Sequence, residues 1–120
     1  MNKCPSCKIG TLAVITSIEL GPDANSDNFR FETFSCGHCD FGGAGEYEES
    51  QRGGDASFAH RGYAMARADF TALDTELRLC AARKNHRCTC PVHMRYRATT
   101  GVHSPTAKLA LVRRDPIALG

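Results

Sequence analysis

The chain has 120 residues, of which 42% are apolar, and it contains seven Cys and no Trp. It shows neither a transmembrane-length apolar run nor the apolar core of a secretory signal, which argues against membrane and secreted classes and predicts a cytoplasmic single domain. The formal net charge of +2 combines −5 in residues 1–79 with +7 in residues 80–120. The basic C-terminal third is therefore predicted to face an anionic partner or the acidic remainder of the chain.

The seven cysteines predict metal ligation rather than disulfide bonds, since cytosolic thiols stay reduced and an odd number cannot all pair within one chain. The stretches Cys4-Pro-Ser-Cys7-Lys-Ile-Gly10 and Cys36-Gly-His-Cys39-Asp-Phe-Gly42 repeat the pattern Cys-x-x-Cys-x-apolar-Gly. Two such turns can supply four sulfur ligands to one Zn²⁺ ion in a closed tetrahedral site, although iron is also possible chemically. The first predicted metal site comprises Cys4, Cys7, Cys36 and Cys39.

The residues between the two cysteine pairs predict a β-hairpin. Residues 11–20 alternate, so that one face of the strand is predicted to carry Leu12, Val14, Ile18 and Leu20. Residues 28–35 alternate too, with Phe29 and Phe31 on the face opposite Arg30 and Glu32. The turn formers in residues 21–27 connect the two strands, and residues 44–50 could add a third strand.

This succession of paired-cysteine turn, hairpin and second paired-cysteine turn resembles the zinc ribbon superfamily over about residues 1–50, within a predicted ribbon unit of residues 1–52. The resemblance implies a structural zinc ion on a hairpin or three-stranded sheet. Zinc ribbons occur in transcription elongation factors, RNA polymerase small subunits and ribosomal proteins, so the resemblance also implies a role in transcription or translation. The ligand pattern is specific for the fold and not for one function.

One long amphipathic helix is predicted for residues 53–84, with Asp55 or Ser57 as its N-cap. Apolar side chains recur at steps of three and four residues, which predicts one buried stripe made of Tyr63, Ala66, Phe70, Leu73, Leu77 and Cys80. This stripe is predicted to pack on the sheet formed by residues 1–52. Cys80 then points inward at the C-terminal end of the helix.

A second metal site is predicted where the chain returns after this helix, with the ligands Cys80, Cys88, Cys90 and His93. Together the two sites use all seven cysteines. His93 is preferred as the fourth ligand because two residues separate it from Cys90, while His86 and His103 are alternatives. The competing interpretation is that Cys80 is a buried apolar residue and that the other cysteines and the histidines are incidental.

The last segment, residues 85–120, is predicted to form the metal loop and a basic tail of the same compact unit. Residues 109–112 could be a short strand or a docked tail, and the last eight residues are predicted to be loosely held. Cations of this region could contact phosphates, and Tyr96 could stack on an unpaired base. The predicted nucleic-acid contacts are Arg83, Lys84, Arg87, Arg95, Tyr96, Arg97, Lys108, Arg113 and Arg114. The alternative for these cations is a solvated surface.

Together these patterns predict a small α+β domain stabilised by two Zn²⁺ ions, with a zinc-ribbon sheet, one long helix and a C-terminal metal loop. The predicted function is non-enzymatic binding of nucleic acid, or of an acidic protein surface, through the basic segment. One alternative is a protein adaptor that docks through the ribbon and the acidic residues 46–50. A less favoured alternative is a zinc hydrolase with an open position at Cys88, Cys90 and His93, because the common catalytic motifs are absent.

Overall fold

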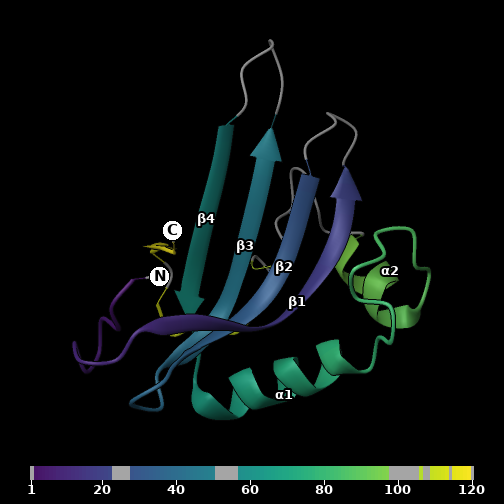
Figure 1. Ribbon diagram of the computed structural model, residues 1–120. Helices are drawn as coiled ribbons and strands as arrows, with labels where there is room; N and C mark the ends of the chain where they lie inside the picture. Colours follow the sequence, from purple (N-terminus) through teal and green to yellow (C-terminus); the bar gives the residue numbers. More distant parts are fainter. Residues whose placement is uncertain are drawn as a thin grey trace.

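A five-stranded antiparallel sheet, with its strands in the order β1-β2-β3-β4-β5, organises the fold (Figure 1). The computed structural model describes residues 2–22, 28–50, 57–97, 106, 109–113 and 115–119. The strands are β1 (Leu12–Pro22), β2 (Asn28–Cys36), β3 (Gly42–Ser50), β4 (Ser57–Ala64) and β5 (Ile117–Ala118), and the helices are α1 (Arg67–Arg78) and α2 (Pro91–Arg97). The predicted hairpin and third strand are thus confirmed as β1, β2 and β3.

Both helices pack on the same face of the sheet and enclose the main core. Helix α1 packs against β1, β2 and β3, whereas α2 packs beside β1 (Figure 1). The rings of Phe31 and Tyr96 stack with their centroids 4.9 Å apart, which joins β2 to α2. Burial of each large apolar side chain contributes on the order of 2 kcal/mol. The main core consists of Ile18, Leu20, Phe29, Phe31, Ala44, Met65, Phe70, Leu73, Leu77, Cys80, Val92 and Tyr96.

A smaller apolar cluster joins the two ends of the chain to the base of the hairpin. Its buried members are Cys4, Leu12, Phe34, Cys36 and Leu119. Strand β5 pairs with β4, and the side chain of Asn2 donates a hydrogen bond to the carbonyl oxygen of Ala118. The prediction of a loosely held C-terminus is therefore wrong for residues 117–119, because Leu119 is only 1% exposed.

A β-bulge divides β1 between these two clusters. Val14 and Thr16 pair with consecutive residues of β2, so Ile15 is an extra residue in the strand. One extra residue moves all later side chains to the other face of a sheet. Leu12 accordingly belongs to the smaller cluster, whereas Ile18 belongs to the main core. The predicted single apolar face of this strand is wrong for that reason.

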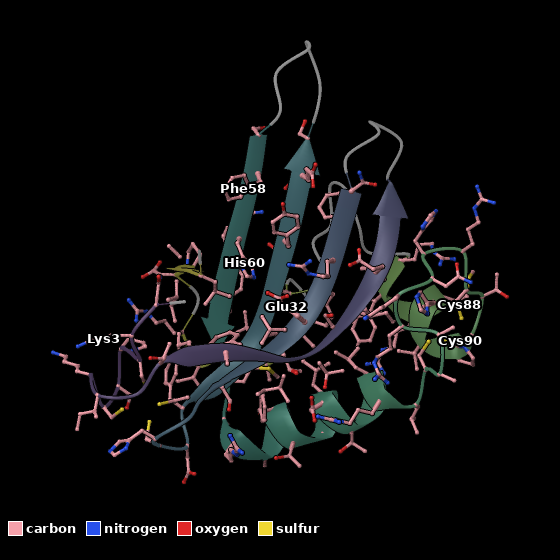
Figure 2. All side chains as sticks on the ribbon, in the orientation of Figure 1. Lys3, Glu32, Phe58, His60, Cys88 and Cys90 are labelled. Atoms are coloured by element: carbon pink, nitrogen blue, oxygen red, sulfur yellow. The ribbon has the colours of Figure 1, made fainter. Side chains whose placement is uncertain are left out.

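The face of β2 opposite the helices carries a fully buried carboxylate, Glu32 (Figure 2). It contacts the imidazole of His60 on β4 and accepts a hydrogen bond of 3.3 Å from Nε of Arg30. The Arg30 guanidinium also lies 4.6 Å from the ring centroid of Tyr47. These partners offset the cost of burying a charge. The predicted opposition of Arg30 and Glu32 to Phe29 and Phe31 is confirmed.

The single helix predicted for residues 53–84 is wrong, because Ser57–Ala64 form strand β4 and only Arg67–Arg78 are helical. The expected N-cap at Asp55 lies outside the described residues, and Ala66 begins α1 without a side-chain cap. Gly62 fits a close contact in this strand, since an added Cβ there would lie 2.7 Å from the ring of Phe34 on β2. A Gly inside a strand often marks such a close approach.

Of the other residues of the predicted apolar stripe, Phe70, Leu73 and Leu77 are confirmed as the buried residues of α1, and Cys80 is buried just after it. Ala66 is exposed, so the stripe is wrong at that position. A second, unpredicted helix follows, since Pro91 begins α2. Residues 109–112 dock beside the end of β4, where the N–H of Val112 donates to a backbone carbonyl at 2.9 Å. Among the described residues, no helix is both long and apolar enough to cross a membrane.

We expect the substitution Gly43→Ala to lower the free energy of unfolding by about 1–3 kcal/mol, the usual cost of overpacking. An added Cβ would lie 1.8 Å from the carbonyl oxygen of Tyr63, so β3 and β4 would have to separate. Gly37→Ala is the matched control, because its Cβ would meet nothing within 4 Å. Urea unfolding of both variants measures the difference, and equal midpoints would contradict this account of the β3–β4 contact.

Candidate metal centres

The first candidate centre lies where the two Cys-x-x-Cys turns meet, at the base of the β1–β2 hairpin. The Sγ–Sγ distance is 3.6 Å for Cys4 and Cys39 and 3.7 Å for Cys7 and Cys36. Sulfur atoms bound at about 2.3 Å to one tetrahedral zinc ion lie about 3.8 Å apart. A disulfide would need about 2.05 Å instead. All four ligand atoms lie within 4.8 Å of one another, so this group could hold a metal ion.

Backbone N–H groups in both turns point at the sulfur atoms of this centre. Gly10 donates to Sγ of Cys7 at 3.4 Å, and His38 donates to Sγ of Cys36 at 3.2 Å. Such bonds favour the thiolate, and the N–H of Gly10 lowers the pKa of Cys7 to about 6. Gly10 must lack a side chain, because a Cβ there would lie 2.4 Å from Sγ of Cys36.

The second candidate centre brings together Cys80, Cys88, Cys90 and His93, whose ligand atoms also lie within 4.8 Å of one another. Cys80 follows α1, His93 lies on α2, and the other two cysteines lie on the connection between these helices (Figure 2). Sγ of Cys80 is 3.9 Å from Sγ of Cys88 and 3.1 Å from Nδ1 of His93. The distance from Sγ of Cys90 to the same nitrogen is 3.5 Å.

The orientation of His93 is fixed by a strand of the sheet. Its ring is fully buried, and Nε2 lies 3.0 Å from the carbonyl oxygen of Glu19 on β1. Because a carbonyl oxygen can only accept, Nε2 carries the proton and the Nδ1 lone pair faces the sulfur atoms. This is the usual outer-shell arrangement of a metal-binding histidine. His86 is exposed beside Gly21, outside the ligand group, and His103 lies outside the described residues.

Two thiols of the second centre, Cys80 and Cys90, have pKa values shifted in opposite directions. The backbone N–H of His93 lowers the pKa of Cys90 to about 6, whereas burial raises the pKa of Cys80 to about 11. Three close thiolates repel one another unless a cation lies among them. A divalent ion bound by all three sulfurs would therefore supply the charge that the buried site otherwise lacks.

Two of the predicted nucleic-acid contacts are engaged within the protein. Arg95 forms an ion pair of 2.7 Å with Glu76, and the hydroxyl of Tyr96 donates to the same carboxylate at 2.6 Å. Tyr96 is only 4% exposed because its ring stacks on Phe31. The prediction that Tyr96 stacks on a base is therefore wrong.

Two further arginines bind backbone carbonyl groups around the second centre. Arg97 donates to the carbonyl oxygen of Cys88 at 2.7 Å and also to that of His86. Arg83 donates to the carbonyl oxygen of Cys80 at 3.1 Å. These contacts hold the connection between the helices in place. The other predicted cations include three exposed residues, Lys84, Arg87 and Arg113. Lys108 and Arg114 lie outside the described residues.

The geometry of the second centre favours a closed site over a catalytic one. An open position at Cys88, Cys90 and His93 would require Cys80 to lie away from the ion, yet Cys80 belongs to the ligand group. The Glu76 carboxylate on α1 is bound by Arg95 and a tyrosine hydroxyl, so it is not free to act as a catalytic base. Sequence reasoning missed the role of the Glu19 carbonyl, because a backbone acceptor has no signature in residue type.

No protein family, curated protein or solved structure matches the chain. Its function must therefore be inferred from the two centres themselves. Each centre gathers four ligand groups of the kind that zinc prefers. The first centre joins two turns that are far apart in the sequence, whereas the ligands of the second all lie within residues 80–93.

We expect His93→Ala to reduce the number of bound zinc ions from two per chain to one, because it removes a ligand of the second centre. His86→Ala is the matched control, since this exposed histidine is outside the ligand group and should leave both ions bound. Native mass spectrometry of the reduced variants counts the ions. Loss of an ion from the His86 variant alone would contradict the assignment of the fourth ligand.

Proposed function

We propose that this chain is a non-enzymatic zinc-binding module in which two Zn²⁺ ions are structural. The observation that carries the proposal is that all seven cysteines and one histidine gather into two closed groups of four. Four protein ligands complete a tetrahedral shell and leave no position for a reactive water. A structural zinc ion contributes on the order of 10 kcal/mol to folding, which equals the whole stability of a typical small domain.

Each ion would join segments that the sheet alone leaves separate. The first would connect the turn before β1 to the turn between β2 and β3, an arrangement that supports the resemblance to zinc ribbons. The second would connect the end of α1 to α2, and His93 extends this connection to β1 through the Glu19 carbonyl. The ions would thus hold in fixed positions the segments that adjoin the two ends of β1.

The surface of this scaffold favours a protein partner over nucleic acid. A protein that binds duplex DNA tightly commonly neutralises about six to ten phosphates. Here Arg95 is paired with a carboxylate, Arg97 holds backbone carbonyls, and the ring of Tyr96 is buried. The remaining predicted contacts close to the second centre are the exposed Lys84 and Arg87, together with Arg83, which also donates to the carbonyl oxygen of Cys80. So few charges suit a short acidic segment of a protein better than a phosphate backbone.

We expect X-ray absorption at the zinc edge to show an average shell of seven sulfur and one nitrogen atoms shared between two ions, without oxygen. This composition follows from the two ligand groups. The variant Cys80→Ser is the comparison, because it opens the second centre and should either lose one ion or gain an oxygen ligand. An oxygen ligand in the wild-type protein would contradict the non-enzymatic assignment and favour the hydrolase.

A further inference from the structure

Among the described residues, the outer edge of β1 is capped at two points and is open between them. This strand is one of the two edge strands of the sheet. Near one end, the N–H of Glu19 donates to the carbonyl oxygen of Arg83 at 2.8 Å, and its own carbonyl faces His93. At the other end, the N–H of Leu12 donates to the carbonyl oxygen of Asn2 at 2.9 Å. The stretch between these caps can still pair with another chain.

Strand geometry identifies the residues that face outward in this stretch. In an antiparallel pair, the backbone groups of every second residue point away from the partner strand. Ser17 therefore faces outward like Glu19, and Val14 faces outward like Leu12. Val14 and Ser17 are three positions apart, and the extra residue of the bulge, Ile15, lies between them. Both residues can therefore face outward. Val14 and Ser17 thus present N–H and C=O groups at the open edge.

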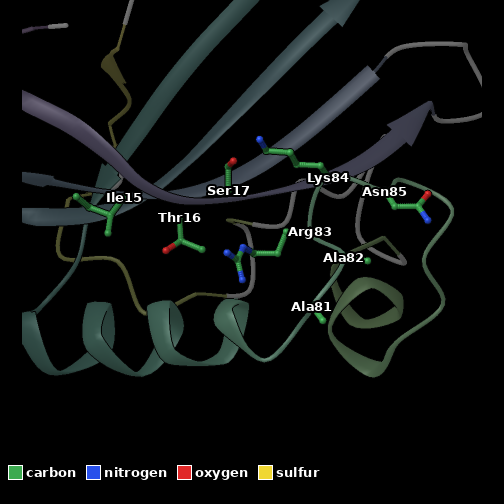
Figure 3. Close-up of a pocket in the computed structure, with 8 residues that line it drawn as sticks. All are labelled: Ile15, Thr16, Ser17, Ala81, Ala82, Arg83, Lys84 and Asn85. Carbon is green, nitrogen blue, oxygen red and sulfur yellow. The ribbon is translucent and has the colours of Figure 1, made fainter.

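A groove of about 590 Å³ lies along this edge, between residues 15–17 of β1 and residues 81–85 (Figure 3). This volume is within the usual range of binding sites, about 300–1,000 Å³. The side chain of Ile15 is 44% exposed and offers an apolar contact there. Both charged residues that line the groove, Arg83 and Lys84, are cations, and their side chains extend toward β1. An occupant with carboxylates would complement this charge.

We propose that this groove binds an extended acidic peptide that adds a strand to the outer edge of β1. The peptide backbone pairs with Val14 and Ser17, an apolar side chain contacts Ile15, and carboxylates face Arg83 and Lys84. Strand addition of this kind draws affinity from main-chain hydrogen bonds and specificity from alternate side chains. The inference names the partner of the zinc module and rests on the proposed function, because ligands of the second centre hold both ends of the segment 81–85.

Charge and hydrogen bonding disfavour two other occupants. A second copy of this chain, paired through the same edge in a two-fold dimer, would set Arg83 and Lys84 against their own counterparts. A phosphate backbone offers acceptors only, so it would leave the outward carbonyl groups of Val14 and Ser17 unpaired. An acidic peptide supplies donors, acceptors and negative charge together.

The direct test is fluorescence anisotropy of the zinc-loaded protein with a labelled synthetic peptide of about eight residues that alternates Val and Glu. We expect saturable binding. N-methylation of the peptide amides along one edge should weaken binding about tenfold, because it removes backbone hydrogen bonds. A peptide alternating Val and Lys should not bind.

Protein variants locate the binding on the molecule. Lys84→Glu should weaken the Val–Glu peptide about tenfold, through loss and reversal of a charge contact. Lys3→Glu is the matched control, because it makes the same charge change on an exposed lysine far from the second centre (Figure 2). Ser17→Pro removes an outward N–H without removing a β1–β2 hydrogen bond, so it should also weaken binding. Native mass spectrometry must count two ions in every variant.

Several outcomes would overturn the inference. If two ions are bound but the peptide fails to bind at about 1 mM, a weak affinity limit, strand addition fails and the zinc module stands. If the wild-type protein holds no ions, the proposed function itself fails. Equal binding of the N-methylated peptide would show that the groove recognises anions without strand pairing. Equal binding of a single-stranded oligonucleotide would show that it is a site for nucleic acid. Dimerisation that Ser17→Pro abolishes would assign the edge to a second copy.

Discussion

Mutual repulsion of close thiolates is the constraint on which the rest of this structure depends. In each centre four ligand atoms lie within 4.8 Å of one another, and backbone N–H groups favour the charged form of the sulfurs. Burial acts in the opposite direction and raises the pKa of Cys80 to about 11. A divalent cation resolves this conflict because it lets every thiol ionise without repulsion. The segments that adjoin the two ends of β1 are then held by charge as well as by apolar contact.

His93 shows how one side chain can couple these two kinds of stabilisation. Its Nδ1 faces the sulfurs, its Nε2 bonds the carbonyl of Glu19, and its helix carries Tyr96 into the main core. Loss of the imidazole would leave a buried carbonyl on β1 without its partner, at a cost of about 1–3 kcal/mol. The second centre is therefore a junction between sheet, helix and core and not a peripheral loop.

The sequence predicted both ligand groups because residue type and spacing are enough to identify candidate metal ligands. Cys-x-x-Cys pairs and the inward position of Cys80 needed no knowledge of tertiary structure. The bulge at Ile15 was beyond prediction, since it depends on the register with β2 and leaves the alternation of residues 11–20 intact. Strand β4 was missed because Tyr63 happens to continue the helical spacing of α1, although Gly62 weakened the case for a helix. Tyr96 was misjudged because Phe31, which buries it, is distant in sequence.

Metal occupancy and strand addition share the segment 81–85, so the two equilibria are linked if both proposals hold. Cys80 and Cys88 lie on either side of this segment, and the carbonyl of Arg83 caps Glu19 at the end of the open edge. A peptide that binds only the arranged groove must stabilise the zinc-bound state, and zinc must strengthen peptide binding by the same factor. Because the first centre lies at the other end of β1, its ion should stabilise the fold without this linkage. Loss of the second ion would then weaken peptide binding, whereas loss of the first would only destabilise the fold.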